Sequence, residues 1–227
     1  MGFTKDSFGV DVPDHQLAAF DAAWAWLASP GGSWTGAEKV AIAEVVRAAR
    51  ARPIWDRRPT TIDHLDATLG PGTLSPLVVD TVERIGVEPG SIDREWAEAV
   101  IDVLGTVAYA ELVAVVATVV PIDRGCALLD REAEPLPTPV PGATTGEHAE
   151  AIVDIGAFIP VAAGFGGANV AKSLSIAPTA NMARLRVVRA LYSGERFGEL
   201  RWEDGALDRP QVELLAARTS ALNECFY

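Results

Sequence analysis

Glu213 and Cys225, which lie 12 residues apart near the end of the printed sequence, are the residues best suited to chemistry. A cysteine thiolate is a nucleophile, and a carboxylate nearby can accept the proton of the thiol. Along a straight helix this spacing spans ~18 Å, so the two side chains meet only if the helix ends near Asn223 and Cys225 opens a new helix that folds back. The free N–H groups of such a helix start would lower the thiol pKa. The alternative is a solvated Glu213 and an inert terminal thiol.

The helices that would position these residues are marked by capping signals. Thr35 to Glu38 and Asp208 to Gln211 have capping-box spacing, which predicts a helix to about Arg50 and a last helix from Gln211 to Leu222. Strand signals are few, so the sequence predicts an all-α fold. The other expected helices are Gln16 to Leu27 capped by Asp14, a helix from Ser75-Pro76 to about Ile85, one starting at Ser91 or Asp93 and carrying Leu104, Ala108 to Leu129 kinked at Pro121, Glu147 to Ile155, Ala168 to Ile176 stopped by Pro178, and Thr179 to Ser193.

The chain is expected to consist of two diverged helical copies, residues 1–133 and 147–227, joined by a proline-rich linker or surface crossing over 134–146. The two capping boxes suggest the repeat, because they align Thr35 with Asp208 without a gap. In this alignment Val40 falls opposite Glu213 and Arg52 falls opposite Cys225. The first copy therefore lacks the residues that suggest chemistry in the second.

The last segment, "LDRPQVELLAARTSALNECFY", resembles the active-site helix of the alkylhydroperoxidase D-like (AhpD-like) and carboxymuconolactone decarboxylase superfamily. The pattern of that superfamily is a Glu, eleven residues, Cys-x-x-Cys and then a His. The segment "NVAKSLSIAPTANMARLRVVRALYSG" is similar to the helix pair that precedes this helix in the superfamily, and "SWTGAEKVAIAEVVRAARARPIW" is similar to a diverged first copy. The resemblance covers about residues 15 to 227.

This resemblance implies a peroxidase or related thiol–disulfide activity, with Cys225 as the redox thiol and Glu213 as its proton acceptor. It also implies a homo-oligomer and a thiol reductant as partner, with no cofactor. The printed chain holds only the first cysteine of the pattern and lacks the His, so we expect it to be inactive or incomplete as a dithiol peroxidase. Either the chain is a degenerate or truncated member, or a cysteine or selenocysteine codon follows Tyr227.

Two other readings remain open at this stage. One is a non-catalytic helical scaffold or binding protein that keeps only the fold, and the other is a carboxymuconolactone decarboxylase-like enzyme, which does not need the cysteine pair. Fold alone does not decide between them, because function resides in the site.

Composition narrows the partners further. The 227 residues carry a formal charge of −12 and are 49% hydrophobic, which argues against nucleic acid and anionic membranes as partners and for a large core. The most apolar window, Val107 to Ile122, contains Glu111 and is shorter than a bilayer-spanning helix. We therefore expect a cytoplasmic protein. No metal site is expected, since His15, His64 and His148 are isolated, and Cys126 is expected to be a core residue. The glycines from Gly164 to Gly167 predict a turn rather than a phosphate loop.

Overall fold

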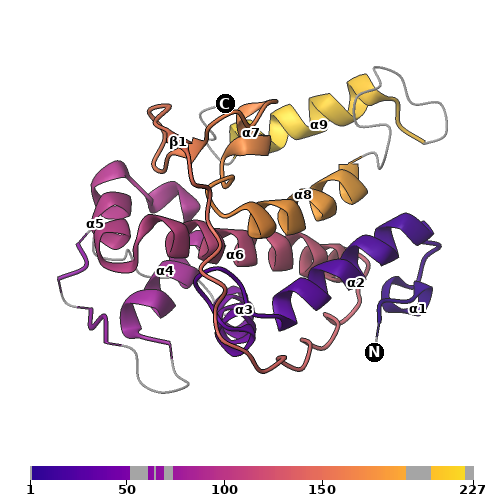
Figure 1. Ribbon diagram of the computed structural model, residues 1–227. Coiled ribbons are helices and arrows are strands. Elements are labelled where there is room, and N and C mark those ends of the chain that lie inside the picture. Colours follow the sequence, from indigo (N-terminus) through magenta and orange to yellow (C-terminus); the bar gives the residue numbers. More distant parts are fainter. Residues whose placement is uncertain (1, 52–60, 64, 69–73, 193–205, 223–227) are drawn as a thin grey trace.

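The protein is built almost entirely from helices, as Figure 1 shows for the computed structural model. The structure describes residues 2–51, 61–63, 65–68, 74–192 and 206–222. Within these ranges the only sheet is an antiparallel ribbon of β1 (Ile152–Val153) and β2 (Val161–Ala162), so the all-α class is confirmed. The helices are α1 (Lys5–Phe8), α2 (Asp14–Ala28), α3 (Gly36–Arg50), α4 (Pro76–Val87), α5 (Arg94–Leu104), α6 (Thr106–Leu128), α7 (Asn169–Lys172), α8 (Pro178–Tyr192) and α9 (Arg209–Leu222), with a 3-10 turn at Pro89–Ser91.

Four helices, α3, α4, α5 and α9, begin where their capping residues predict. The two capping boxes form reciprocal bonds: Glu38 N donates to Thr35 Oγ1 at 3.3 Å, and Thr35 N donates to Glu38 Oε2 at 2.8 Å. Asp208 and Gln211 exchange equivalent bonds of 2.9 Å at the start of α9. Ser75 and Asp93 accept bonds from the N–H groups three residues on and thereby start α4 and α5. Because a side-chain oxygen replaces the missing partner of a free N–H, these starts are fixed locally.

Four details of the predicted helices are wrong. Asp14 is not a cap, because α2 begins at Asp14 with Pro13 at the N-cap position. The helix predicted over 147–155 is replaced by extended chain and β1, whose backbone bonds are tertiary: Ala149 N donates to Ile176 O and Ala163 N to Ala151 O. The helix predicted over 168–176 is only the short α7, and turns follow it. Pro178 opens α8, where its fixed φ and missing N–H are tolerated.

The long apolar helix α6 forms the centre of the core. It packs against α3, α4, α5 and α8, and α8 also packs against α2. By length and composition α6 could cross a membrane, so the predicted window was too short, but more than half of its most apolar stretch is buried inside the protein. Packing on several sides explains its apolar surface without a bilayer.

Segments far apart in the chain share this core. One cluster joins residues such as Trp26, Ile42 and Val115 with Ile176 and Ala180, which lie beyond the proline-rich segment. A second cluster joins Phe3, Phe8, Phe20 and Trp24 with Val187 of α8. Residues on both sides of the proline-rich segment therefore bury their side chains together.

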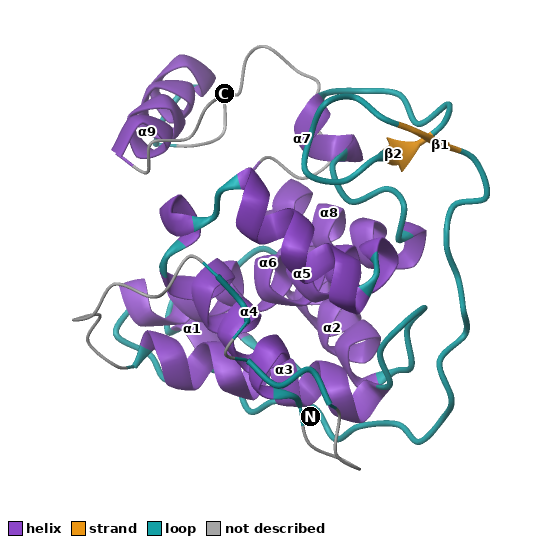
Figure 2. Cartoon of the chain, turned by 90° about the vertical axis from the view of Figure 1, so that its left-hand side faces the viewer, coloured by secondary structure: helices purple, strands orange, loops and turns teal. Residues whose placement is uncertain are grey.

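The proline-rich segment crosses the surface as an extended strap, residues 131–149, which runs along the edge of the molecule in Figure 2. Its backbone is bonded to the end of α2 and to the turn after it. Val140 N donates to Ala28 O, Thr145 N to Gly31 O and Gly146 N to Gly32 O, at 2.8–3.0 Å. The indole of Trp24 adds a bond of 2.9 Å to Pro135 O. These bonds explain how a segment without helical structure keeps its backbone groups satisfied.

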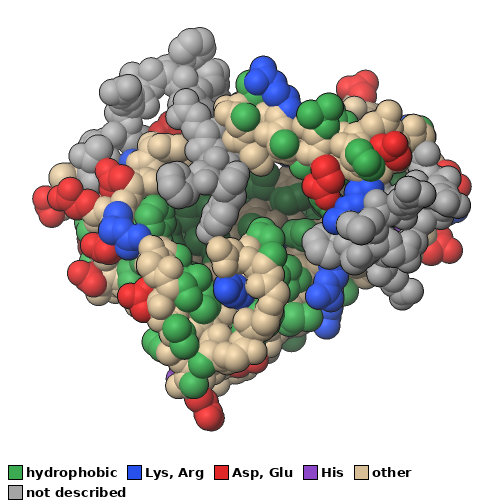
Figure 3. Space-filling model, turned by 90° about the horizontal axis from the view of Figure 1, so that it is seen from above, with side chains coloured by type: hydrophobic (Ala, Val, Ile, Leu, Met, Phe, Trp, Pro, Cys, Tyr) green, Lys and Arg blue, Asp and Glu red, His purple; other side chains and the backbone are tan. Residues whose placement is uncertain are grey.

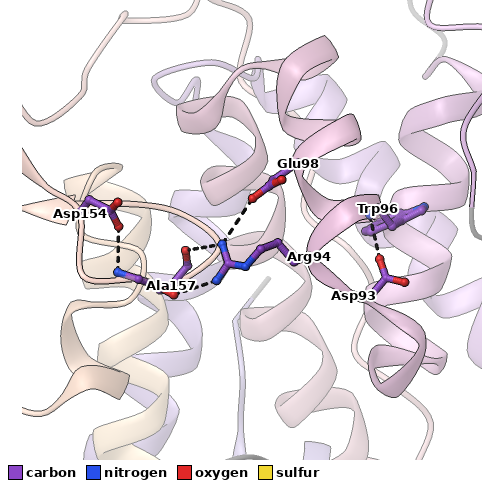
Figure 4. Close-up of polar contacts among 7 residues, drawn as sticks. Asp93, Arg94, Trp96, Glu98, Asp154 and Ala157 are labelled. Carbon is purple, nitrogen blue, oxygen red and sulfur yellow. Dashed lines mark hydrogen bonds and ion pairs between the residues drawn. The ribbon is translucent and has the colours of Figure 1, made fainter.

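The loop between β1 and β2 is attached to the start of α5 (Figure 4). The Arg94 guanidinium donates to Gly156 O at 2.8 Å and to Ala157 O at 3.2 Å, and it lies 5.4 Å from the ring centre of Phe158. Arg94 also pairs with Glu98 one turn later, at 3.4 Å. One exposed arginine thus joins the ribbon to the helical body.

Candidate functional site

Glu213 lies at the beginning of α9, held by two partners. Its carboxylate accepts a bond of 3.2 Å from Arg209 Nε, four residues earlier on the same helix. The hydroxyl of Tyr192, the last described residue of α8, is also hydrogen-bonded to Glu213. α9 follows α8 after residues that the structure does not describe, and this bond links the end of α8 to α9.

The hydrogen bonds of Glu213 shift the pKa of its carboxyl. Hydrogen bonding from Tyr192, and then from Arg209, lowers the pKa of the Glu213 carboxyl below its ordinary value. Burial, and then the bond to Glu213, raises the pKa of Tyr192 to about 12. An ordinary glutamate is already ionised at neutral pH, and the lowered pKa keeps Glu213 in that state. The same shift makes it a weaker base than an ordinary glutamate.

Cys225, the other predicted site residue, lies outside the described residues. The last described helical residue is Leu222, three positions before it. The structure therefore brings Glu213 together with Tyr192 and Arg209 and leaves its relation to Cys225 a prediction. Arg209 could have been found from its i,i+4 spacing to Glu213, whereas no local signal in the sequence pairs Tyr192 with Glu213.

A second group of ionisable side chains, which the sequence did not reveal, lies in the interior between α3 and α6. Lys39 and Glu111 are 0% and 1% exposed. Lys39 Nζ donates to Trp26 O at 2.7 Å and lies 4.2 Å from the ring centre of Trp26. Glu111 Oε2 accepts a bond of 2.7 Å from Ser33 N. These contacts fasten the turn between α2 and α3 to α6.

Burial has the largest effect on the pKa values of both side chains. It lowers the pKa of Lys39 to about 8, against the opposing charge of Glu111. It raises the pKa of Glu111, although the N–H of Ser33 and the charge of Lys39 oppose the shift. Glu111 Oε1 has no hydrogen-bond partner among the described residues, and a Cβ at Gly31 would lie only 1.6 Å from it. The carboxylate is packed tightly against the turn and helps to hold it through the bond from Ser33 N.

The remaining candidates for chemistry are placed as follows. Cys126 is fully buried in α6, as predicted for a core residue, and burial raises the pKa of its thiol. The predicted glycine turn is present, since Gly164 and Gly167 have φ of 75° and 100° and connect β2 to α7. In the described part of the chain, no three His, Cys, Asp or Glu side chains are placed to share a metal ion.

The comparisons with known proteins add no relative to this description. No protein-family model, no curated protein and no solved structure matches the chain.

Proposed function

We propose that this chain is an AhpD-like, cytoplasmic thiol redox protein in which Cys225 is the redox thiol and Glu213 accepts its proton. The observation that supports the proposal is the placement of Glu213. It lies in the first half of α9, twelve residues before Cys225 in the sequence, at the spacing of the superfamily pattern, and Tyr192 and Arg209 hydrogen-bond its carboxylate. An ionised carboxylate is what deprotonation of a thiol requires.

The proposed reaction balances with an external thiol as reductant. Glu213 takes the proton of the Cys225 thiol, and the thiolate attacks one peroxide oxygen. The O–O bond breaks, Cys225 becomes a sulfenic acid, and the departing alkoxide takes the proton from Glu213. A first external thiol condenses with the sulfenic acid and releases water, and a second one cleaves the mixed disulfide and restores Cys225. The two electrons thus come from two external thiols.

The test measures one round of Cys225 oxidation by an alkyl hydroperoxide, by intact-mass spectrometry after trapping of the sulfenic acid. We expect oxidation of the unaltered chain and none at this position in Cys225→Ser. Glu213→Gln should slow the step at least about tenfold, because a positioned proton acceptor contributes that much or more. Further turnover should require an external thiol, because in the proposed cycle both electrons come from external thiols.

Glu98→Gln is the matched control. It removes the carboxylate of another i,i+4 Arg–Glu pair, on α5, with a comparable distance of 3.4 Å against 3.2 Å for Arg209 and Glu213. The control should oxidise at the rate of the unaltered chain. Equal slowing in both variants, or none in either, would count against a role for Glu213.

One observation favours the non-catalytic scaffold as a second candidate. No described residue of α9 is buried, and Leu214, Leu215 and Leu222 are 70%, 57% and 65% exposed. Such a helix presents apolar surface that a partner could cover. If Cys225 reacts with hydroperoxide no faster than a free thiol while the chain forms a stable oligomer, the scaffold is the better reading.

A further inference from the structure

An apolar groove lies over the outer face of α8. The glycine-rich loop 164–168 and the short α7 form one wall, and Met182, Leu185 and Val188 of α8 line its floor. Its volume is about 530 Å³, within the range of small-molecule sites. Figure 3 shows this face of the molecule hollowed at its centre, with hydrophobic side chains in the hollow.

Buried polar side chains hold the wall of this groove in place. Arg184, 6% exposed, donates to Val170 O at 2.7 Å and to Asn181 Oδ1 at 2.8 Å. Asn181 in turn donates to Ala171 O at 2.9 Å. The bonds to Val170 O and Ala171 O run from α8 to the α7 segment that forms the wall. The groove is therefore built before any ligand arrives, and little ordering is lost on binding.

A positively charged side chain lies at the groove. Among the described residues that line the groove, Arg189 is the one with a charged side chain, and this exposed guanidinium has no ion-pair partner in the described part of the chain. A single guanidinium can bind a carboxylate with two hydrogen bonds, whereas a phosphate dianion would call for more donors.

We propose that this groove binds a small amphipathic carboxylate, with its apolar chain over Met182, Leu185 and Val188 and its head group at Arg189. The head group would lie one turn of α8 from Tyr192, because residues three apart share a helix face. A bound acid would thus end beside the Tyr192–Glu213 contact. The inference does not depend on redox chemistry at Cys225, so it can be tested in the Cys225→Ser chain.

The test is titration calorimetry of Cys225→Ser with straight-chain carboxylates from butanoate to decanoate. Affinity should rise about two- to fourfold per added methylene, as expected for partial to full burial of each group. Arg189→Gln should weaken decanoate about three- to fivefold, the strength of a partly exposed ion pair, and leave decanol unchanged. Arg186→Gln, an exposed arginine of the same helix outside the groove, is the matched control and should change neither.

Val188→Trp tests the floor by filling the groove, and it should abolish decanoate binding while the helical circular dichroism is retained. If this variant fails to fold, the comparison of Arg189→Gln with Arg186→Gln still decides. Equal affinities in those two variants, or no dependence on chain length, would overturn the proposal. Binding to anionic vesicles without binding to free decanoate would also overturn it and would identify a membrane as the occupant. Loss of self-association in Val188→Trp would overturn it as well and would identify a second copy of the chain as the occupant.

Discussion

At the scale of single residues, the contact between Tyr192 and Glu213 makes a prediction that does not depend on Cys225. Tyr192→Phe removes the hydrogen bond that contributes most to the low pKa of Glu213. The Glu213 pKa should therefore rise toward its ordinary value, which carboxyl-carbon nuclear magnetic resonance titration can measure. Other exposed carboxylates in the same spectrum provide the reference, and an unchanged Glu213 pKa would show that Arg209 alone sets it.

Lys39 predicts a pH dependence of stability. Its pKa is lowered from 10.5 to about 8 in the folded protein, so the unfolded chain binds more protons between these values. The free energy of unfolding should therefore rise as pH increases from about 8 to 10.5. This gain comes from the deprotonation of Lys39, and it disappears as pH falls back to about 8. Relative to Lys39→Met, which cannot titrate, the rise should reach up to roughly 3 kcal/mol.

Urea titrations of both chains at pH 8 and pH 10 give the comparison, and the tyrosines cancel because both chains contain them. A pH-independent difference would mean that Lys39 keeps its ordinary pKa in the folded protein and is well solvated there.

The sequence predicts ionic contacts between neighbours on one helix but not the burial of charged residues that are far apart in the chain. Glu213 and Arg209 are four apart on one helix, and such a pair is visible in the printed letters. Lys39 and Glu111 look like ordinary surface charges, and only the packing of α3 against α6 buries them. Lys39 and Glu111 lie 72 positions apart in the chain (111 minus 39), and no local pattern encodes the shared burial of residues at that separation.

At the scale of elements, the start of α5 offers a clean test of capping. Asp93 Oδ1 accepts a bond of 2.8 Å from Trp96 N, as Figure 4 shows. Asp93→Ala should lower the free energy of unfolding by about 1 kcal/mol, because the N–H group loses its partner. Asp93→Ser should restore most of the loss, since a hydroxyl can cap as well.

Asp102→Ala is the control for this prediction, because it removes an exposed aspartate from the same helix without touching a cap. Its effect should stay within about 0.5 kcal/mol, as for most surface substitutions. Equal losses in the Asp93 and Asp102 variants would point to general charge effects on α5 instead of capping.

Element starts were predictable where the signal is a capping side chain within three residues. The helix expected over 147–155 failed for the opposite reason. Its apolar residues suit a helix, but the strap before it and two tertiary bonds, Ala149 N to Ile176 O and Ala163 N to Ala151 O, draw the backbone into extended structure. Tertiary partners overrode a weak local preference, which a sequence read in short windows does not contain.

At the scale of the whole molecule, the expected homo-oligomer has a candidate surface in the exposed leucines of α9. Light scattering should give a mass that is a multiple of 24.0 kDa at micromolar concentration. Changing Leu214 and Leu222 to Lys should reduce that mass, because burying two charges at an interface is unfavourable.

Leu128→Lys is the control for the oligomer prediction. Leu128 is 84% exposed at the end of α6, so this change adds a charge to an apolar side chain away from α9. A monomer in the unaltered chain would contradict the expectation, and an oligomer that only Leu128→Lys disrupts would move the interface to α6.

The helical class followed from composition and periodicity, whereas the shared core did not. The placement of α8 against α2 joins positions more than a hundred residues apart, and its packing against both α2 and α6 depends on shape complementarity that only the folded chain contains. The internal repeat remains a prediction, since a common core neither requires nor excludes two related copies.

The strap has a consequence for how the chain is held together. Because α8 is buried among α2 and α6, the covalent link over 131–149 acts mainly to keep two interlocking pieces at a high effective concentration. Cleavage within it, for example between Pro135 and Pro139, would leave fragments joined by the core alone. Their association would then depend on dilution, so a nicked chain should remain helical when concentrated and come apart when diluted. The strap therefore links the two parts covalently, and the packing of the buried helices holds them together.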